Sequence, residues 1–389
     1  MNNTESASFA YIGDDQQVKM SPTIGHDVKS LSHSYGPSGE SIACLWPLWS
    51  PNNRWIAYFQ LGSIELPPSI CITEVNGIEQ RVLAYETEGM PIYAAWSPDS
   101  HQLAVLFQLD ELQLYVYHID QLGEGKLIAE GAPLFFRWLE DSTGLLVHSI
   151  HKRAGNSTLI NTSLLPYGED SSLSQRPGGF SVPLLINDHT VFAEKSQNKT
   201  YIYQSGLNGD DKTLLFDVVG VVSMQRHPSK PLIAYASAPS SDGTPFVGLS
   251  IFNIMGPSHQ LVFKDELSSF YWSPCGERLL LVRVDREKRC MHLEMWSESE
   301  GLTYVHPFWP TREQIFHIHF FEQFDLSHKQ FSECGKYFVY SGFRKKDIDE
   351  GISLEPYVFL TDLNTLQTRA VCKGLFATFP QIERPCDNG

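Results

Sequence analysis

The residues of this chain most suited to chemistry lie in the stretch from 301 to 330. Within it, His317, His319 and Glu322 place two imidazoles near a carboxylate, and Arg312 and His328 flank them. Imidazoles and carboxylates bind transition metals and carry protons in catalysis. If the segment is an extended strand, His317 and His319 point to the same face, because side chains alternate along a strand. The stretch is therefore a candidate for a metal or acid–base site.

A structural role explains the same residues. The two histidines alternate with Phe316, Ile318 and Phe320, and such a pattern also covers the face of a sheet. The His-x-His spacing is not that of a structural zinc motif. Residues 311–314, Thr-Arg-Glu-Gln, also fit the capping box at the start of a helix. We favour the structural interpretation, and we expect neither a metal nor another cofactor.

A repeated unit organises the elements that must position these residues. It begins with Trp-Ser-Pro, continues through two turn-forming residues and ends in a short apolar β run, as at Trp49, Trp96 and Trp272. Weaker copies begin at Trp138 and Phe331, and two more lack the aromatic residue. The anchors lie near residues 49, 96, 138, 184, 226, 272 and 331. Repeats of about 40–50 residues that hold several short strands are typical of β-propeller blades.

The two ends of the chain complete one further unit. Residues 8–35 offer three strands with no first strand before them, and residues 374–381 offer a first strand with nothing after it. Joined in one sheet, they would close the ring and remove its free edges. We therefore predict an all-β chain that forms a single domain over residues 1–389. The expected fold is an eight-bladed β-propeller whose last blade is shared by the N- and C-termini, and seven blades are the alternative.

The Trp-Ser-Pro-Asp/Asn unit, followed by a strand such as Ile56-Ala57-Tyr58, resembles the TolB-like (PD40-type) propeller repeat. The blade pattern is also similar to that of the propellers of dipeptidyl-peptidase and prolyl-oligopeptidase enzymes. Residues 320–324, with Ser327-His328, resemble bacterial TolB-like proteins without an assigned activity. The resemblance implies a docking platform, a peptidase gate or an enzyme site in the central funnel. The chain lacks the G-x-S-x-G elbow that a peptidase of this group would carry.

Polar residues at the ends of the inner strands form a second candidate site. In a propeller these ends face the central channel. Arg137 stands beside Trp138, while Arg226 and His227 replace the motif residues in a copy that lacks tryptophan. We therefore predict that Arg137, Arg226 and His227 line the channel and contact a ligand or water there.

Charge and composition narrow the possible partners. With 45 acidic against 29 Lys and Arg residues, the formal charge is −16, which disfavours nucleic acid and anionic membranes. The N-terminus lacks a basic start and an apolar run, so no secretory signal is expected. The seven cysteines are scattered and form no CxxC pair, as expected for a protein of the reducing cytoplasm.

These observations lead to three alternative functions. The first is a non-catalytic platform that binds another protein or a small ligand in the central channel. The second is a small-molecule enzyme, a lyase, hydrolase or isomerase, whose site lies in the funnel. The third is a detached regulatory propeller of the peptidase group, which would bind peptides or a separate hydrolase.

Overall fold

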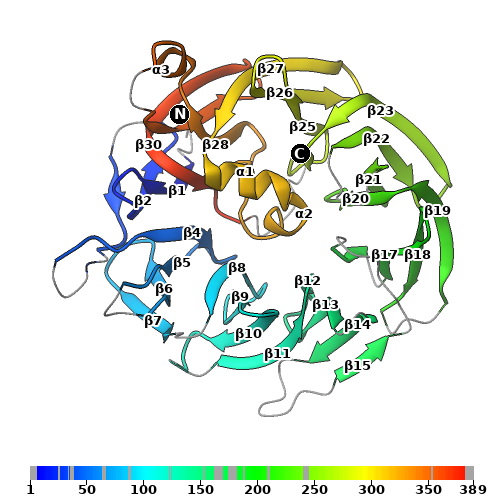
Figure 1. The fold of residues 1–389 in the computed structure, drawn as a ribbon, viewed down its shortest axis with the longest axis horizontal. Helices are drawn as coiled ribbons and strands as arrows, with labels where there is room; N and C mark the ends of the chain where they lie inside the picture. The colour runs from blue at the N-terminus through cyan, green and yellow to red at the C-terminus, as the bar shows by residue number, and fades with distance from the viewer. Residues whose placement is uncertain are drawn as a thin grey trace, which may run out of the picture.

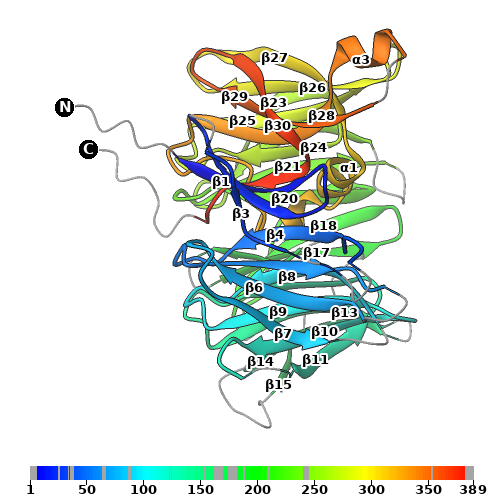
Figure 2. The ribbon, with the colours of Figure 1, turned by 90° about the vertical axis from the view of Figure 1, so that its left-hand side faces the viewer.

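The fold is that of a computed structural model in which strands surround a central axis as a closed ring (Figure 1). Seen from the side, the strands stack as a thick disc (Figure 2). The structure describes residues 7–24, 27–33, 35, 39–63, 67–85, 89–121, 123, 125–151, 154–161, 170–173, 182–186, 189–207, 211–239, 245–351 and 354–381. This architecture confirms the all-β class predicted from the repeat.

Five units of the ring are separate four-stranded antiparallel sheets, each made of consecutive strands. Their strands are β4 (Cys44–Trp49), β5 (Trp55–Gln60), β6 (Ser69–Glu74) and β7 (Gln80–Tyr85); β8 (Met90–Trp96), β9 (Gln102–Gln108), β10 (Leu112–His118) and β11 (Gly125–Gly131); β12 (Leu134–Trp138), β13 (Gly144–His151), β14 (Ala154–Asn161) and β15 (Asp170–Leu173); β16 (Leu184–Ile186), β17 (His189–Ser196), β18 (Lys199–Gly206) and β19 (Thr213–Val219); and β20 (Val221–Arg226), β21 (Leu232–Ala238), β22 (Phe246–Asn253) and β23 (Ser258–Leu267). Each sheet starts with the inner strand that carries one of the predicted anchors.

The remaining strands join in one ten-stranded sheet. In sheet order they are β24 (Ser269–Trp272), β25 (Arg278–Asp285), β26 (Cys290–Ser297), β27 (Gly301–Pro310), β28 (Tyr337–Phe343), β29 (Pro356–Asp362), β30 (Gln367–Thr378), β1 (Ser8–Gly13), β2 (Val18–Pro22) and β3 (Lys29–Ser30). Only two residue pairs connect β27 to β28. Since the sheet runs on through that point, the choice between seven and eight blades stays a prediction.

The two ends of the chain lie in the same sheet, as the sequence predicted. Ala10 of β1 is opposite Thr378 of β30, and Ile12 is opposite Phe376. Strand β30 pairs with β29 through its first half and with β1 through its second half, so it serves two blades. Figure 2 shows β1 and β30 side by side. The ring is closed by hydrogen bonds between strands from opposite ends of the chain.

The Trp-Ser-Pro motif forms the turn after the inner strands β4, β8 and β24. The serine hydroxyl accepts the backbone N–H five residues on, for example from Ser97 to Gln102 at 2.9 Å. The fifth motif position has a left-handed backbone, which suits small polar residues and glycine. The residues at this position are Asn53 (φ 55°), Ser100 (66°), Ser142 (63°), Gly276 (74°) and Gly335 (65°). The repeat is thus a turn signal with one demanding position.

Three of the anchor tryptophans, Trp49, Trp96 and Trp138, join neighbouring blades. Trp96 Nε1 donates to the carbonyl of Leu48 at 3.4 Å, and Trp138 Nε1 donates to that of Ala95 at 3.0 Å. In the same way, Trp49 Nε1 donates to Thr378 at 3.2 Å. In each pair the acceptor directly precedes the anchor residue of the preceding unit. The bond to Thr378 therefore marks Phe379 as the anchor of the unit that the two chain ends share.

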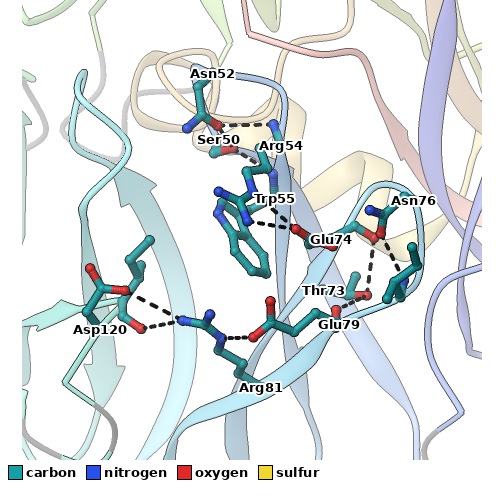
Figure 3. A network of polar contacts seen from close by, with 12 residues as sticks. Ser50, Asn52, Arg54, Trp55, Thr73, Glu74, Asn76, Glu79, Arg81 and Asp120 are labelled. Carbon is teal, nitrogen blue, oxygen red and sulfur yellow. Dashed lines mark hydrogen bonds and ion pairs between the residues drawn. The ribbon is translucent and has the colours of Figure 1, made fainter.

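Polar contacts reinforce the outer part of the first separate sheet (Figure 3). The guanidinium groups of Arg54 and Arg81 lie over the ring of Trp55, 5.0 and 5.1 Å from its centre. Arg54 Nη2 also bonds to Glu74 at 2.9 Å, and Arg81 Nη1 lies 3.6 Å from Asp120 in the next sheet. Each exposed pair contributes little by itself. Together they order a buried tryptophan and connect two sheets.

Three helices interrupt the β structure in the part of the chain that the structure describes: α1 (Arg312–His319), α2 (Phe321–Phe324) and α3 (Lys345–Asp349). Helix α1 overturns the extended arrangement considered for His317 and His319 and agrees with the capping alternative. Thr311 is its N-cap, and the Thr311 hydroxyl accepts from Gln314 N at 3.2 Å. No helix among the described residues is long and apolar enough to cross a membrane.

Candidate functional site: a funnel floored by a helical insert

Residues 311–330, here called the insert, lie inside the ring, with α1 and α2 near its centre (Figure 1). The rings of Phe324 and Phe316 pack against Trp46, with centroids 4.9 and 5.5 Å apart. Phe321 packs against Phe270 at 5.0 Å. The insert lengthens the step between two anchors because it folds inward and fills the middle of the channel.

Hydrogen bonds fix the insert to three inner strands. Gln323 pairs with the backbone of Phe136 in β12, accepting from its N–H at 3.2 Å and donating to its carbonyl at 2.9 Å. Glu322 Oε1 accepts from the N–H of Met224 in β20 at 2.6 Å. The hydroxyl of Tyr93 in β8 donates to the Gln323 carbonyl at 2.8 Å. These bonds tie α2 to the wall of the channel.

A cavity of about 940 Å³, here called the funnel, lies between the insert and the motif turns. Inner-strand ends form its wall and the insert forms its floor. Aromatic and proline residues of the repeat dominate the wall: Trp96, Trp138, Trp272, Phe136, Phe331, Pro51, Pro98, Pro228 and Pro274. Seven charged side chains also line it: Asp99, Arg137, Glu140, Arg226, Glu322, Asp325 and Lys329. This mixture of apolar walls and a few charges is typical of binding pockets.

Most charges in the funnel have partners within the protein. Arg226 Nη1 lies 3.0 Å from Glu140 and donates to the Leu185 carbonyl at 2.7 Å. Lys329 Nζ lies 3.6 Å from Asp325 Oδ2. Arg137 differs, because its buried Nη1 has no hydrogen-bond partner among the described residues. Arg137 is therefore the one cation of the described lining without a bonded partner, while Glu140 and Asp325 attract it from farther away.

Burial changes the proton affinity of the funnel groups. Burial, together with a smaller repulsion from Arg226, lowers the pKa of Arg137 to about 9, against the attraction of Glu140 and Asp325. Burial also raises the pKa of Glu322 to about 8, although the N–H of Met224 opposes the shift. The pKa of Asp325 is raised by burial as well, against the attraction of Lys329. At pH 7 Arg137 is charged while Glu322 is mostly neutral.

The predicted channel residues divide into two groups. Arg137, Arg226 and Glu322 lie in the funnel. His227 does not line it. Its Nδ1 accepts from the N–H of Lys230 at 2.9 Å, and its Nε2 donates to the Gly276 carbonyl at 3.0 Å. It therefore holds its own turn in place of the motif serine and contacts the next blade, beside a separate smaller cavity.

The insert histidines His317, His319 and His328 do not line the funnel. His317 is buried, donating from Nε2 to the His328 carbonyl at 3.2 Å and facing the Tyr271 hydroxyl at 3.4 Å. His328 is buried among aromatic rings, and its Nδ1 bonds to the Ser327 hydroxyl at 2.8 Å. Burial lowers the pKa of His317 to about 4 and that of His328 to about 3, so both are neutral.

Arg312 and His319 are exposed on α1 and lie outside the funnel. Conversely, sequence reasoning missed Tyr93, Glu140, Asp325 and Lys329 as lining residues. Glu140 stands in the third position of a motif copy, so the repeat itself could have revealed it. Asp325 and Lys329 are four residues apart and form an ion pair in the insert. Their place in the funnel depends on the inward fold of that segment, which no local pattern signals.

One cluster among the described residues brings together three groups that could hold a metal: Asp285, Cys290 and His292. It lies on the hairpin of β25 and β26, and none of its members lines the funnel. Asp285 Oδ2 is 3.3 Å from His292 Nε2 and also 3.3 Å from the ammonium of Lys288. The carboxylate already has a cationic partner there.

No family model and no curated protein matches the chain. Solved structures do match: the C-terminal WD40 domain of Sif2 has 14% identity and a TM-score of 0.54, over 88% of this chain and 89% of that one. The β-propeller domain of the Trilobed protease from Pyrococcus furiosus has 13% identity and a TM-score of 0.52, over 85% and 97%. These two similarities show the β-propeller fold and carry nothing about the chemistry of the site.

TolB from Acinetobacter baumannii is also among the similar structures, with 13% identity and a TM-score of 0.43. The match covers 79% of this chain but 64% of TolB, so the chain spans less than two thirds of that protein. TolB proteins are thus found among the structural neighbours. Any activity or partner of those proteins comes to this chain only as a proposal.

Proposed function

We propose that the protein is a non-catalytic binding platform, and that its funnel receives a segment of another protein. The observation that carries this proposal is the funnel itself, which combines a fixed floor with walls of tryptophan and proline. Aromatic residues are enriched where interfaces concentrate their binding energy. The floor is bonded to three inner strands, so the pocket is formed before its ligand arrives, which lowers the entropic cost of binding.

The lining also argues against a hydroxyl or thiol nucleophile activated by a histidine. Among the described residues that line the funnel there is no histidine, cysteine or threonine. The hydroxyl of Ser100 accepts a bond from Asn52 N at 3.0 Å, and that of Tyr93 donates to the insert. Neither is paired with a base. We also propose a cytoplasmic location, because the described cysteines are all free.

An enzyme acting on a small molecule is the second candidate. It is favoured by Glu322, a carboxyl in a cavity with its pKa raised to about 8, which suits a general acid. Asp325 lies close by in the same insert. Against this role, Glu322 is bonded to Met224 N, so part of its carboxyl group is engaged in holding the floor.

Site-specific photo-crosslinking tests the platform. A photoreactive residue at Asp99, exposed on the rim, should crosslink one partner protein in cells of the source organism. The matched control places the same residue at Met255, which is 79% exposed on an outer hairpin. Crosslinks of equal yield from both positions, or none from Asp99, would contradict the proposal. Turnover of a small molecule that is lost in Glu322→Gln would favour the enzyme instead.

A further inference from the structure

We infer that the funnel holds a carboxylate group of its ligand at Arg137. This inference rests on the proposed function, since it names the chemical group that the funnel binds. It begins with the pairing of charges. Arg226 is paired with Glu140 and Lys329 with Asp325, at 3.0 and 3.6 Å. Asp99 accepts bonds from the Ser97 hydroxyl and from His101 N within its own turn.

Arg137 is left as the one cation of the described lining without a bonded partner. An arginine cannot escape this position by losing its proton at neutral pH, as a buried lysine or histidine can. A buried guanidinium N–H without a hydrogen-bond partner is unfavourable. The sequence nevertheless places an arginine in the wall of a cavity large enough for a ligand. An anionic ligand group would remove that cost.

The surrounding charges select the kind of anion. Glu140 and Asp325 lie near enough to contribute to the electrostatic field at Arg137. They disfavour a dianion such as a phosphate monoester, whereas a single negative charge balances the one unpaired guanidinium. A carboxylate also matches the planar fork of arginine, which can donate two parallel hydrogen bonds to it. The tryptophan and phenylalanine walls suit the apolar remainder of such a ligand.

Benzoate is a suitable probe, because it combines one carboxylate with an aromatic ring. We expect millimolar benzoate to raise the melting temperature of the full chain by roughly 2 °C near ten times its Kd. Benzamide, which has the same shape but no charge, should give no shift, and inorganic phosphate should give less than benzoate. A shift with benzamide equal to that with benzoate, or a larger shift with phosphate, would overturn the assignment.

Two substitutions locate the group. Arg137→Gln should abolish the benzoate shift, because it removes the guanidinium whose buried Nη1 lacks a partner. Arg137→Lys keeps the charge without the fork and should weaken benzoate at least tenfold. Arg312→Gln is the matched control: it removes an exposed arginine outside the funnel and should leave the benzoate response unchanged. A full benzoate shift in folded Arg137→Gln would refute the inference.

The same probe separates two sources of the carboxylate. If it belongs to the partner protein, benzoate should reduce the crosslink formed from position 99. If it belongs to a separate small acid, benzoate should shift the melting temperature and leave that crosslink intact. A crosslinked partner combined with no benzoate response in the native protein would support the platform and refute the carboxylate site.

Discussion

His317 in the insert and Arg137 in the wall of the funnel are two buried titratable groups with opposite surroundings. In the insert, His317 uses both ring nitrogens, one toward the His328 carbonyl and one toward the Tyr271 hydroxyl. In the funnel, Arg137 Nη1 has no partner among the described residues. His317 is fully buried and Arg137 is partly buried, and burial disfavours the charged form of each.

The two groups differ in how they respond to the unfavourable free energy of a buried charge. Histidine gives up its proton, so His317 is neutral at pH 7 and packs as part of an aromatic core. Arginine, with its pKa lowered only to about 9, stays charged. A polar group with its partners built in holds structure together, while a charged group without them is available to a ligand. Substitutions in the insert and in the funnel test this contrast.

The largest effect is expected from the insert core. Phe324 is 2% exposed and packs against the rings of Trp46 and Tyr93, at 4.9 and 5.1 Å. Phe324→Ala should lower the free energy of unfolding by about 4 kcal/mol, since it opens a cavity among these rings. Urea unfolding measures this change. Leu261→Ala, at a 66% exposed outer position, should change stability by less than about 0.5 kcal/mol. An equally small change at Phe324 would show that the insert is not part of the core.

The next effect is acid destabilisation through the neutral histidines. The folded pKa of His317, about 4, lies below the value of 6.5 expected when the chain is unfolded. The unfolded chain therefore binds the proton first, and stability falls as pH decreases through the window from 6.5 to 4. The loss should reach roughly 3 kcal/mol for this residue alone between pH 7 and 4.

Denaturant unfolding at a series of pH values measures that slope. His317→Gln should flatten it at the cost of lower stability at pH 7, because the glutamine does not fill the same site. His319→Gln, at an exposed position of the same helix, should leave the slope as it is. A slope unchanged by His317→Gln would mean that the imidazole is not held neutral.

A smaller effect of opposite sign is expected from the floor of the funnel. The pKa of Glu322 rises from 4.5 to about 8 on folding, so the folded chain binds the proton more tightly. Stability should therefore fall as pH rises, by about 1.4 kcal/mol between pH 7 and 9. Glu322→Gln should remove this loss, because an amide does not titrate. The amide oxygen can still accept from Met224 N, so the bond to β20 is kept. The comparison of the two proteins by thermal unfolding at pH 7 and 9 is the measurement. Equal losses in both would assign the alkaline decline to other groups.

Much of the fold could be read from the repeat. Trp-Ser-Pro specifies a turn. The left-handed backbone at the fifth position restricts which residue can stand there, so the copies remain visible even where the tryptophan has changed. The closure of the ring was predictable because each chain end supplied the strands that the other lacked. The pairing of Ala10 with Thr378 confirms that complementarity.

The site was only partly predictable. The inner-strand position of Arg137 and Arg226 follows directly from the repeat. The insert was harder to predict, because a His-x-His pair is compatible with a strand and with a helix, and only the capping box at residues 311–314 indicated the helix. Whether a helix folds into a ring or away from it depends on contacts with residues far along the chain, such as Trp46 and Phe270. His227 was misplaced because an imidazole at a strand end was expected to point inward, whereas it caps its own turn.

Because β1 pairs with β30, the chain could begin and end at another turn of the ring without a change in strand pairing. A short linker between the present termini, with a new opening at the exposed turn around Met255 that joins β22 and β23, would preserve the order of strands in every sheet. Such a circular permutant would keep the funnel intact and carry its new ends on the outer circumference. In this permutant β30 and β1 would be consecutive strands joined by a loop. Their pairing, which now joins the two ends of the sequence, could then form early in folding.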